Sequence, residues 1–230
     1  FSFQSVKKAC EINPGAIVTA PVAKNALYLA GHKFNGQTEI LQKYLAHDGQ
    51  HAEMLFVAGQ FRVLLLTRHC ALKDVTISKK MLVEKIKKLN NIFEEKFEII
   101  PPKFALCAFN PHAGEDGILG SEELEILNPA VKILQKKGIN ITYPLPADTL
   151  FVEAAKKYYA EKKLPYDCYI ANYHDQGLIP IKTVAGDKTV NMTIGLDIIR
   201  TSPGHGTAFD IAGKNLADET GMIEAIKAVL

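Results

Sequence analysis

The sequence carries almost no net charge, and this absence excludes whole classes of partner. Its 230 residues hold 27 Lys and Arg against 25 Asp and Glu, a formal net charge of +2. A charge balance this even supplies neither the basic stripe that a phosphate backbone requires nor a broad attraction to anionic membranes. We therefore expect neither nucleic acid nor a membrane as a partner.

Long apolar runs and paired cysteines are also missing. The longest apolar stretches fall far short of the ~20 residues that a membrane span requires. Cys10, Cys70, Cys107 and Cys168 are widely spaced and form no C-x-x-C pair, which is typical of a reduced, cytoplasmic protein. The chain opens at Phe1 without a signal-peptide pattern, and we expect that further residues precede it.

Short apolar runs alternate with helical patterns from end to end, which predicts an α/β fold with a mixed, largely parallel sheet and flanking helices. Stretches rich in β-branched or aromatic residues are expected as strands over 16–19, 52–58, 61–66, 104–109, 140–143, 168–171 and 190–194. Helices are expected over 24–30, 38–45, 78–97, 121–137, 148–160 and 220–230. Two of them have N-cap signals, at Ser121 and at Asp148.

Domain boundaries are weakly marked, because no repeat, low-complexity tract or linker interrupts this pattern. The Pro101-Pro102 step and the region around Gly186 are the best candidates. Boundaries near 101 and 186 predict two α/β subdomains built from discontinuous pieces of chain.

Three histidines stand where the active crevice of an open α/β sheet is expected. His69, His112 and His174 each lie at or just after the end of a predicted strand. Three neutral imidazoles suit a divalent metal with open positions for substrate, and Asp175 is placed to orient His174. Their spacing matches no metal motif, and solvated strand-end histidines are the alternative. The metal site is therefore a hypothesis at this point.

Other loops hold residues that can bind an anion. Gln37 and Thr38 open a predicted helix, where the first N–H groups are unpaired, although an ordinary helix cap is the alternative. Lys182, Asn191 and Arg200 carry the donors that a phosphate or carboxylate needs. The sequence has neither a P-loop nor a Gly-x-Gly-x-x-Gly fingerprint after a strand. It also has no convincing arrangement for a covalent nucleophile.

Six segments together carry a resemblance to a known family. They are Asn110-Pro111-His112-Ala113-Gly114-Glu115, Pro146-Ala147-Asp148-Thr149-Leu150-Phe151, Tyr173-His174-Asp175-Gln176-Gly177, Asn191-Met192-Thr193-Ile194-Gly195-Leu196, Ile199-Arg200-Thr201-Ser202 and Gly204-His205-Gly206-Thr207-Ala208. In order and approximate spacing they are similar to the signatures of the 4-hydroxythreonine-4-phosphate dehydrogenases. The resemblance spans essentially the whole chain, while the family's N-terminal third has no counterpart in it.

The resemblance implies two α/β domains with a central cleft, the architecture of isocitrate and isopropylmalate dehydrogenases. It also implies a metal-dependent enzyme that oxidises the 3-hydroxyl of 4-phosphooxy-L-threonine with NAD or NADP. Decarboxylation to 3-amino-2-oxopropyl phosphate follows, in pyridoxal 5'-phosphate (vitamin B6) biosynthesis. The family works as a homodimer with its active site at the subunit interface.

Carried over by position, the family's metal ligands fall on His69, His112 and His174. Zinc is expected first, with cobalt or magnesium as the other candidates, and His174 is expected to join His69 and His112 of the partner subunit. Lys182 and Asp175 are supporting candidates for the chemistry.

The family's substrate contacts fall on Gln37, Thr38, Lys182, Asn191 and Arg200. The residues that contact the nicotinamide cofactor stay unidentified.

Two departures from the family pattern leave alternatives open. Gln37 and Ala23 stand where the family usually has histidine, and glutamine cannot be protonated. One alternative is a sister dehydrogenase acting on 4-phospho-threonate or 4-phospho-erythronate. A metal-dependent phosphate-ester hydrolase and a non-catalytic binding module are further ones.

Overall fold

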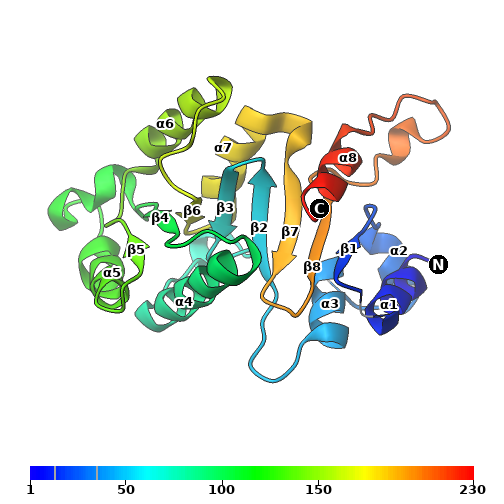
Figure 1. Cartoon of the computed structure of the whole chain (residues 1–230), viewed down its shortest axis with the longest axis horizontal. Helices are drawn as coiled ribbons and strands as arrows, with labels where there is room; N and C mark the ends of the chain where they lie inside the picture. The colour runs from blue at the N-terminus through cyan, green and yellow to red at the C-terminus, as the bar shows by residue number, and fades with distance from the viewer. Residues whose placement is uncertain (13, 35) are drawn as a thin grey trace. The chain divides into compact units, whose positions relative to one another are not determined.

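The computed structural model describes residues 1–12, 14–34 and 36–230. The chain divides into two compact units: unit 1 is Phe1–Ala58 with Ala185–Leu230, and unit 2 is Gly59–Val184. The described residues form eight strands, with helices beside them (Figure 1). Strand pairs are parallel in unit 2 and mixed in unit 1. The expected α/β class with a mixed, largely parallel sheet is thereby confirmed.

Unit 1 consists of elements from both ends of the chain: α1 (Ser2–Ile12), β1 (Ala16–Val18), α2 (Lys24–Leu29), α3 (Gln37–Leu45), β2 (Glu53–Ala58), β7 (Val190–Ile194), β8 (Ile199–Pro203) and α8 (Thr220–Lys227). Its strand order is β1-β8-β7-β2. Strand β1 runs parallel to β8, and β7 runs antiparallel to both β8 and β2. Strand β8 was absent from the predicted elements, because its central Arg-Thr-Ser sequence looks like a polar loop.

Helix α1 gives unit 1 much of its apolar core. Phe3, Val6 and Cys10 are buried in one cluster with Ile17 of β1 and Ile40 of α3. The opposite face of the helix is solvated.

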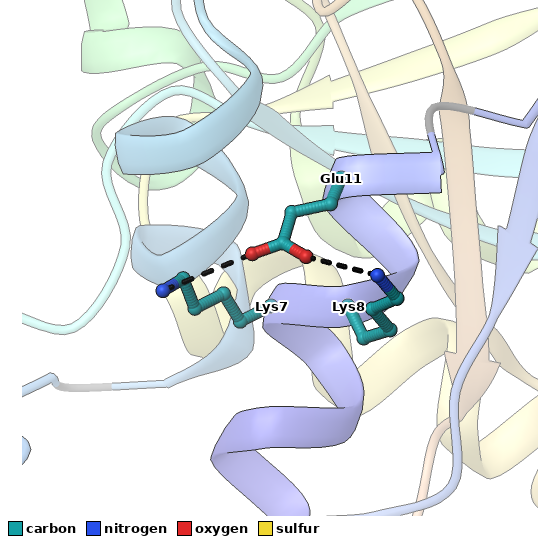
Figure 2. A network of polar contacts seen from close by, with 3 residues as sticks. All are labelled: Lys7, Lys8 and Glu11. Atoms are coloured by element: carbon teal, nitrogen blue, oxygen red, sulfur yellow. Dashed lines mark hydrogen bonds and ion pairs between the residues drawn. The ribbon is translucent and has the colours of Figure 1, made fainter.

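That solvated face carries a small polar network (Figure 2). Glu11 forms an ion pair with Lys7 at 3.8 Å and accepts a hydrogen bond from Lys8 at 3.3 Å. Exposed pairs of this kind contribute only ~0.2–0.5 kcal/mol each. The apolar face therefore determines where α1 packs.

Unit 2 holds the middle of the chain: β3 (Phe61–Leu65), α4 (Lys79–Lys96), β4 (Lys103–Leu106), α5 (Asn128–Gln135), β5 (Asn140–Ile141), α6 (Ala147–Tyr159), β6 (Cys168–Ala171) and α7 (His174–Ala185), of which the last residue falls in unit 1. Its strand order is β3-β6-β4-β5. Phe61, Phe104 and Tyr169 are fully buried, as expected for parallel strands covered on both faces.

Helix α7 lies in a part of the chain for which no helix was expected. Gly177 and Pro180 fall inside it, and both residues usually interrupt helices. A Cβ at Gly177 would lie 2.8 Å from side-chain atoms of Leu65 and Val63. Packing against β3 thus requires a glycine there, and this tertiary contact overrides the local signal.

Two predicted helix starts also differ. Instead of one helix over 121–137, the chain forms a π-helical turn, Glu123–Leu127, that leads into α5. Helix α6 begins at Ala147 after Pro146, so Asp148 lies in its first turn, and no side chain of the described residues caps either start.

The unit boundaries fall at two places along the chain. One lies between Val184 and Ala185, next to the expected region around Gly186. The other lies between Ala58 and Gly59, in the turn between β2 and β3, whereas the Pro101-Pro102 step connects α4 to β4 inside unit 2. Within residues 1–12, 14–34 and 36–230, no helix has both the length and the apolar character needed to cross a bilayer.

Candidate functional site

One edge of unit 2 gathers the three histidines predicted as metal ligands. Strand β6 pairs in parallel with β3 on one side and with β4 on the other, so the carboxyl ends of all three strands meet at one edge. His69 follows β3, His112 follows β4, and His174 begins the helix after β6. The strand order places His174 after the central strand.

His69 and His174 are close neighbours. Their ring centroids lie 5.5 Å apart, and both residues line a cavity of about 370 Å³ together with Arg68, Cys70 and Tyr173. His174 Nδ1 lies 2.7 Å from Asp175 Oδ1. A carboxylate on one ring nitrogen leaves the other nitrogen available as a metal ligand, and it fixes the orientation of the ring.

His112 lines a different cavity. This cavity, of about 690 Å³, lies between the loop after β4 and helices α6 and α7. Tyr173 and Asp175 line both this cavity and the cavity of His69 and His174. Over the described part of the chain, no group of three or more His, Cys, Asp or Glu residues is arranged to hold a metal ion. A single chain therefore supplies a pair of imidazoles, with the third in the adjoining cavity.

Asn172 and Gln176 tie the three strand ends together. The side-chain nitrogen of fully buried Asn172 donates to the backbone carbonyl of Cys107 at 2.8 Å. The backbone carbonyl of Asn172 accepts from the Thr67 hydroxyl at 2.7 Å. Gln176 accepts from the Asn172 N–H at 2.8 Å and donates to the Ala108 carbonyl at 2.7 Å. These hydrogen bonds hold the strand ends in one arrangement, although Asn172 Oδ1 is buried and finds no partner within the described residues. The network explains part of the polar density in the segment that opens α7.

The buried thiols near these strands are not nucleophiles. Burial raises the pKa of Cys168 to about 12 and raises the pKa of Cys107 as well. Both thiols therefore stay protonated at neutral pH, and a thiolate is the reactive form. This agrees with the absence of a covalent nucleophile from the sequence motifs.

The loop that carries His112 forms a left-handed turn. Within Pro111–Gly117, the φ angles of His112, Ala113, Gly114, Glu115 and Asp116 are 53°, 56°, 80°, 42° and 55°. Left-handed backbone costs roughly 1–2 kcal/mol for each residue that has a Cβ. Such a conformation persists only where its surroundings hold it, and it is concentrated at functional sites.

Asp116→Gly is expected to stabilise the protein by about 1 kcal/mol, because the exposed aspartate occupies a left-handed position that glycine adopts without strain. The measurement is the midpoint of urea unfolding. Glu125→Gly is the control: because Glu125 is exposed and helical, its replacement by glycine should lower the free energy of unfolding by a similar amount. Destabilisation by Asp116→Gly would contradict the left-handed turn.

Arg200 is a buried cation in unit 1. It is 3% exposed, and its Nε donates to the hydroxyl of Thr19 at 2.8 Å. Burial lowers the pKa of Arg200 to about 10, so the side chain stays charged at neutral pH. No carboxylate in the described residues forms an ion pair with it. An unpaired buried charge is costly, and an anionic ligand would offset that cost. Sequence reasoning selected Arg200 but missed Thr19.

Other predicted substrate contacts lie in the same unit. In the sheet register Arg200 faces Thr193, two residues after Asn191, so the side chains of Arg200 and Asn191 project from the same face. Gln37 Nε2 donates to the Ala20 carbonyl at 3.0 Å, in the segment next to Thr19. Gln37 Oε1 and Asn191 Oδ1 are buried and find no hydrogen-bond partner within the described residues. Thr189 Oγ1 and Thr193 Oγ1 are in the same state, so unit 1 holds a buried cation and four such polar atoms among its described residues.

Thr38 and Lys182 complete the predicted set. Thr38 is 7% exposed in the first turn of α3, beside Gln37. Lys182 is an exposed residue of α7 and belongs to unit 2.

A large cavity in unit 1 was not predicted. It has a volume of about 910 Å³ and is lined mainly by the segment from His205 to Asp218, together with Pro21, Ala23 and Ala26. Many of the lining residues are glycine or alanine, so the backbone is accessible, and Phe209 is 71% exposed. The glycine-flanked His205 lines this cavity, and it is the sequence feature that could have indicated the cavity.

The sequence is similar to characterised proteins over nearly its whole length. The family model described as pyridoxal phosphate biosynthetic protein PdxA matches residues 2–229. A 4-hydroxythreonine-4-phosphate dehydrogenase of Bradyrhizobium diazoefficiens is 44% identical over 217 residues, which are 93% of this chain and 61% of that protein. The chain thus spans about three fifths of the length of this relative.

Solved structures give the same result. A 4-hydroxythreonine-4-phosphate dehydrogenase from Burkholderia phymatum matches with a TM-score of 0.79 at 41% identity, over 98% of this chain and 68% of that one. A β-decarboxylating dehydrogenase from Thermococcus kodakarensis matches with a TM-score of 0.57 at 13% identity, over 98% of this chain and 67% of that one. The second likeness concerns the fold alone.

Proposed function

The chain belongs to the family of the pyridoxal phosphate biosynthetic protein PdxA, and from this premise we propose that it forms the larger part of a 4-hydroxythreonine-4-phosphate dehydrogenase. The complete enzyme would oxidise the 3-hydroxyl of 4-phosphooxy-L-threonine with NAD or NADP. Decarboxylation to 3-amino-2-oxopropyl phosphate would follow. The observation that carries the proposal is the buried Arg200, which forms an ion pair with no carboxylate of the described residues and projects from the same sheet face as Asn191, because a small anionic substrate supplies the charge that this site lacks.

The substrate site assigns complementary roles to its residues. Arg200 neutralises a phosphate or carboxylate, and the polar side chains of Thr38 and Asn191 orient it. The unpaired oxygen of Gln37 accepts from a substrate ammonium or hydroxyl group. Lys182 of α7 is a further substrate contact that the family resemblance implies. The anionic product of oxidation is bound by the same groups.

A divalent metal fits the strand-end histidines only when ligands from more than one chain are combined. The adjacent imidazoles of His69 and His174 and the Asp175 contact at His174 support the donor set, and His112 supplies the third nitrogen. When bound, the metal supplies Lewis-acid polarisation of substrate oxygen atoms. Zinc suits three imidazoles best, and cobalt or magnesium are the alternatives. A homodimer with its active site at the subunit interface meets this requirement.

The cavity of unit 1 is a candidate site for the nicotinamide cofactor. Its volume of about 910 Å³ is large enough for a dinucleotide. Accessible backbone along the segment after His205 can bind phosphate without a Gly-x-Gly-x-x-Gly turn, and the exposed ring of Phe209 offers a stacking surface.

The reduced thiols agree with a cytoplasmic enzyme.

The test is the rate of NAD or NADP reduction by the full-length protein with added divalent metal. We expect absorbance of reduced nicotinamide with 4-phosphooxy-L-threonine and a much slower rate with 4-phospho-threonate or 4-phospho-erythronate. Faster reduction with the latter two would assign the sister activity. Metal-dependent phosphate release without nicotinamide would identify a hydrolase instead.

A further inference from the structure

Glu123 is a buried carboxylate with an unusual set of partners. It is 2% exposed. Its Oε1 accepts from the backbone N–H groups of Phe109 and Asn110, each at 2.7 Å, and its Oε2 accepts from the side-chain nitrogen of Asn110 at 2.9 Å. All three donors lie in Phe109 and Asn110, the two residues that immediately precede Pro111–Gly117. The carboxylate thus fixes the chain where that turn begins.

The same carboxylate also lies against the middle of the turn. A Cβ at Gly114 would lie 2.8 Å from Glu123 Oε2 and 3.2 Å from the carbonyl oxygen of Gly120. The Leu119 N–H donates to the Gly114 carbonyl at 3.1 Å and closes the turn. Glu123 therefore contacts the loop on the N-terminal side of His112 and again two residues after it.

An acceptor-only group suits this position. Asn110 Nδ2 donates to Glu123 Oε2 and, at 2.6 Å, to Glu122 Oε2. A glutamine at 123 keeps one oxygen for the two backbone N–H groups, but it places an NH₂ group against the NH₂ group of Asn110. A carboxylate satisfies every donor at once, and a buried donor left unpaired is costly.

We propose that Glu123 is a positioning residue, whose buried carboxylate holds the left-handed turn and thereby places the imidazole of His112 for metal binding. This inference rests on the proposed function, because it takes His112 as a metal ligand. Residues that orient metal ligands typically change metal affinity by about 10–100-fold when they are replaced. The strained turn needs such support, since its four residues with a Cβ do not favour positive φ.

The experiment measures Zn²⁺ affinity of the full-length protein by competition with a chromophoric chelator. Glu123→Gln is expected to weaken binding by about 10–100-fold while circular dichroism stays that of wild type. Glu125→Gln, in the same π-helical turn but exposed, is the matched control and should bind as wild type does. With Co²⁺ at saturation, the d–d spectrum of Glu123→Gln should move toward that of His112→Ala, a change that a general loss of stability does not produce.

The possible outcomes separate this inference from the proposed function. Wild-type affinity and spectrum in Glu123→Gln, together with weak binding by His112→Ala, would overturn the role of Glu123 and keep the metal site. Unchanged affinity in His112→Ala would remove the metal assignment itself. Hydrogen exchange then decides whether Glu123 holds the turn: faster exchange of the Phe109 and Asn110 amides in Glu123→Ala, which removes both acceptor oxygens, supports it, and unchanged exchange overturns it.

Discussion

Arg200→Met is expected to lower kcat/KM of the full-length enzyme by a factor on the order of 10²–10³, because removing one partner of a buried charge pair costs about 2–5 kcal/mol. Methionine has a similar length and no charge, so it removes the desolvation cost of the guanidinium while it preserves packing. The free energy of unfolding should therefore change much less than the activity does. Steady-state kinetics and urea unfolding of the same preparation measure the two effects.

Arg62→Met is the matched control for this substitution. Arg62 is also a partly buried arginine with a pKa lowered by burial, but it lies near the N-terminal end of β3, away from the strand ends that carry the histidines. Its replacement should leave kcat/KM near the wild-type value. Equal losses in both variants would show that Arg200 acts through stability rather than through the substrate.

Deprotonation of Arg200 at high pH should change the stability of the protein and its substrate affinity in opposite directions. Its pKa in the folded protein is about 10, below the ordinary 12.5, because burial disfavours the cation. A cation with a depressed pKa costs stability while it is charged, and this cost is relieved as pH rises from about 10 to 12.5. Substrate affinity should change in the opposite direction, since the neutral form no longer attracts an anion. A KM that rises near pH 10 in wild type but not in Arg200→Met would carry this signature.

Most of the fold could be predicted from the sequence, and the exceptions have physical reasons. The apolar runs of β3 and β6 are visible because parallel strands bury both faces. Strand β8 was missed because its Arg-Thr-Ser sequence resembles a polar loop, although Arg200 and Ser202 are buried in the structure. Helix α7 was missed because Gly177 and Pro180 usually interrupt helices, and only the tertiary structure shows that Gly177 packs against β3.

Only the part of the candidate site that follows directly from the positions of strand ends could be predicted. His69, His112 and His174 were selected because each follows a strand, and parallel pairing brings those ends to one edge. The left-handed turn could not be predicted, since three of its φ angles belong to Ala113, Glu115 and Asp116, which normally avoid that region. Glu123 looked like an early helix residue, because only the tertiary structure places its carboxylate against the chain after β4.

Hybrid dimers provide the test with the largest contrast. We expect His112→Ala and His174→Ala each to be nearly inactive as homodimers, because each removes one ligand from every metal site. Co-expression with two different tags isolates the hybrid dimer. If ligands come from both subunits, one of its two sites contains only intact histidines, and about half of the wild-type rate should return. A hybrid as inactive as its parents would contradict a site shared between subunits.

The choice of partner variant then decides which histidines belong to the same chain. The resemblance places His69 and His112 together, with His174 from the partner subunit, so hybrids of His69→Ala with His174→Ala should regain activity. The 5.5 Å separation of the His69 and His174 rings favours the other division, in which these two act as one pair and His112 crosses the interface. In that case His69→Ala with His174→Ala stays inactive, and His69→Ala with His112→Ala recovers. The two arrangements are therefore distinguishable, because the hybrid that is active under one arrangement is inactive under the other.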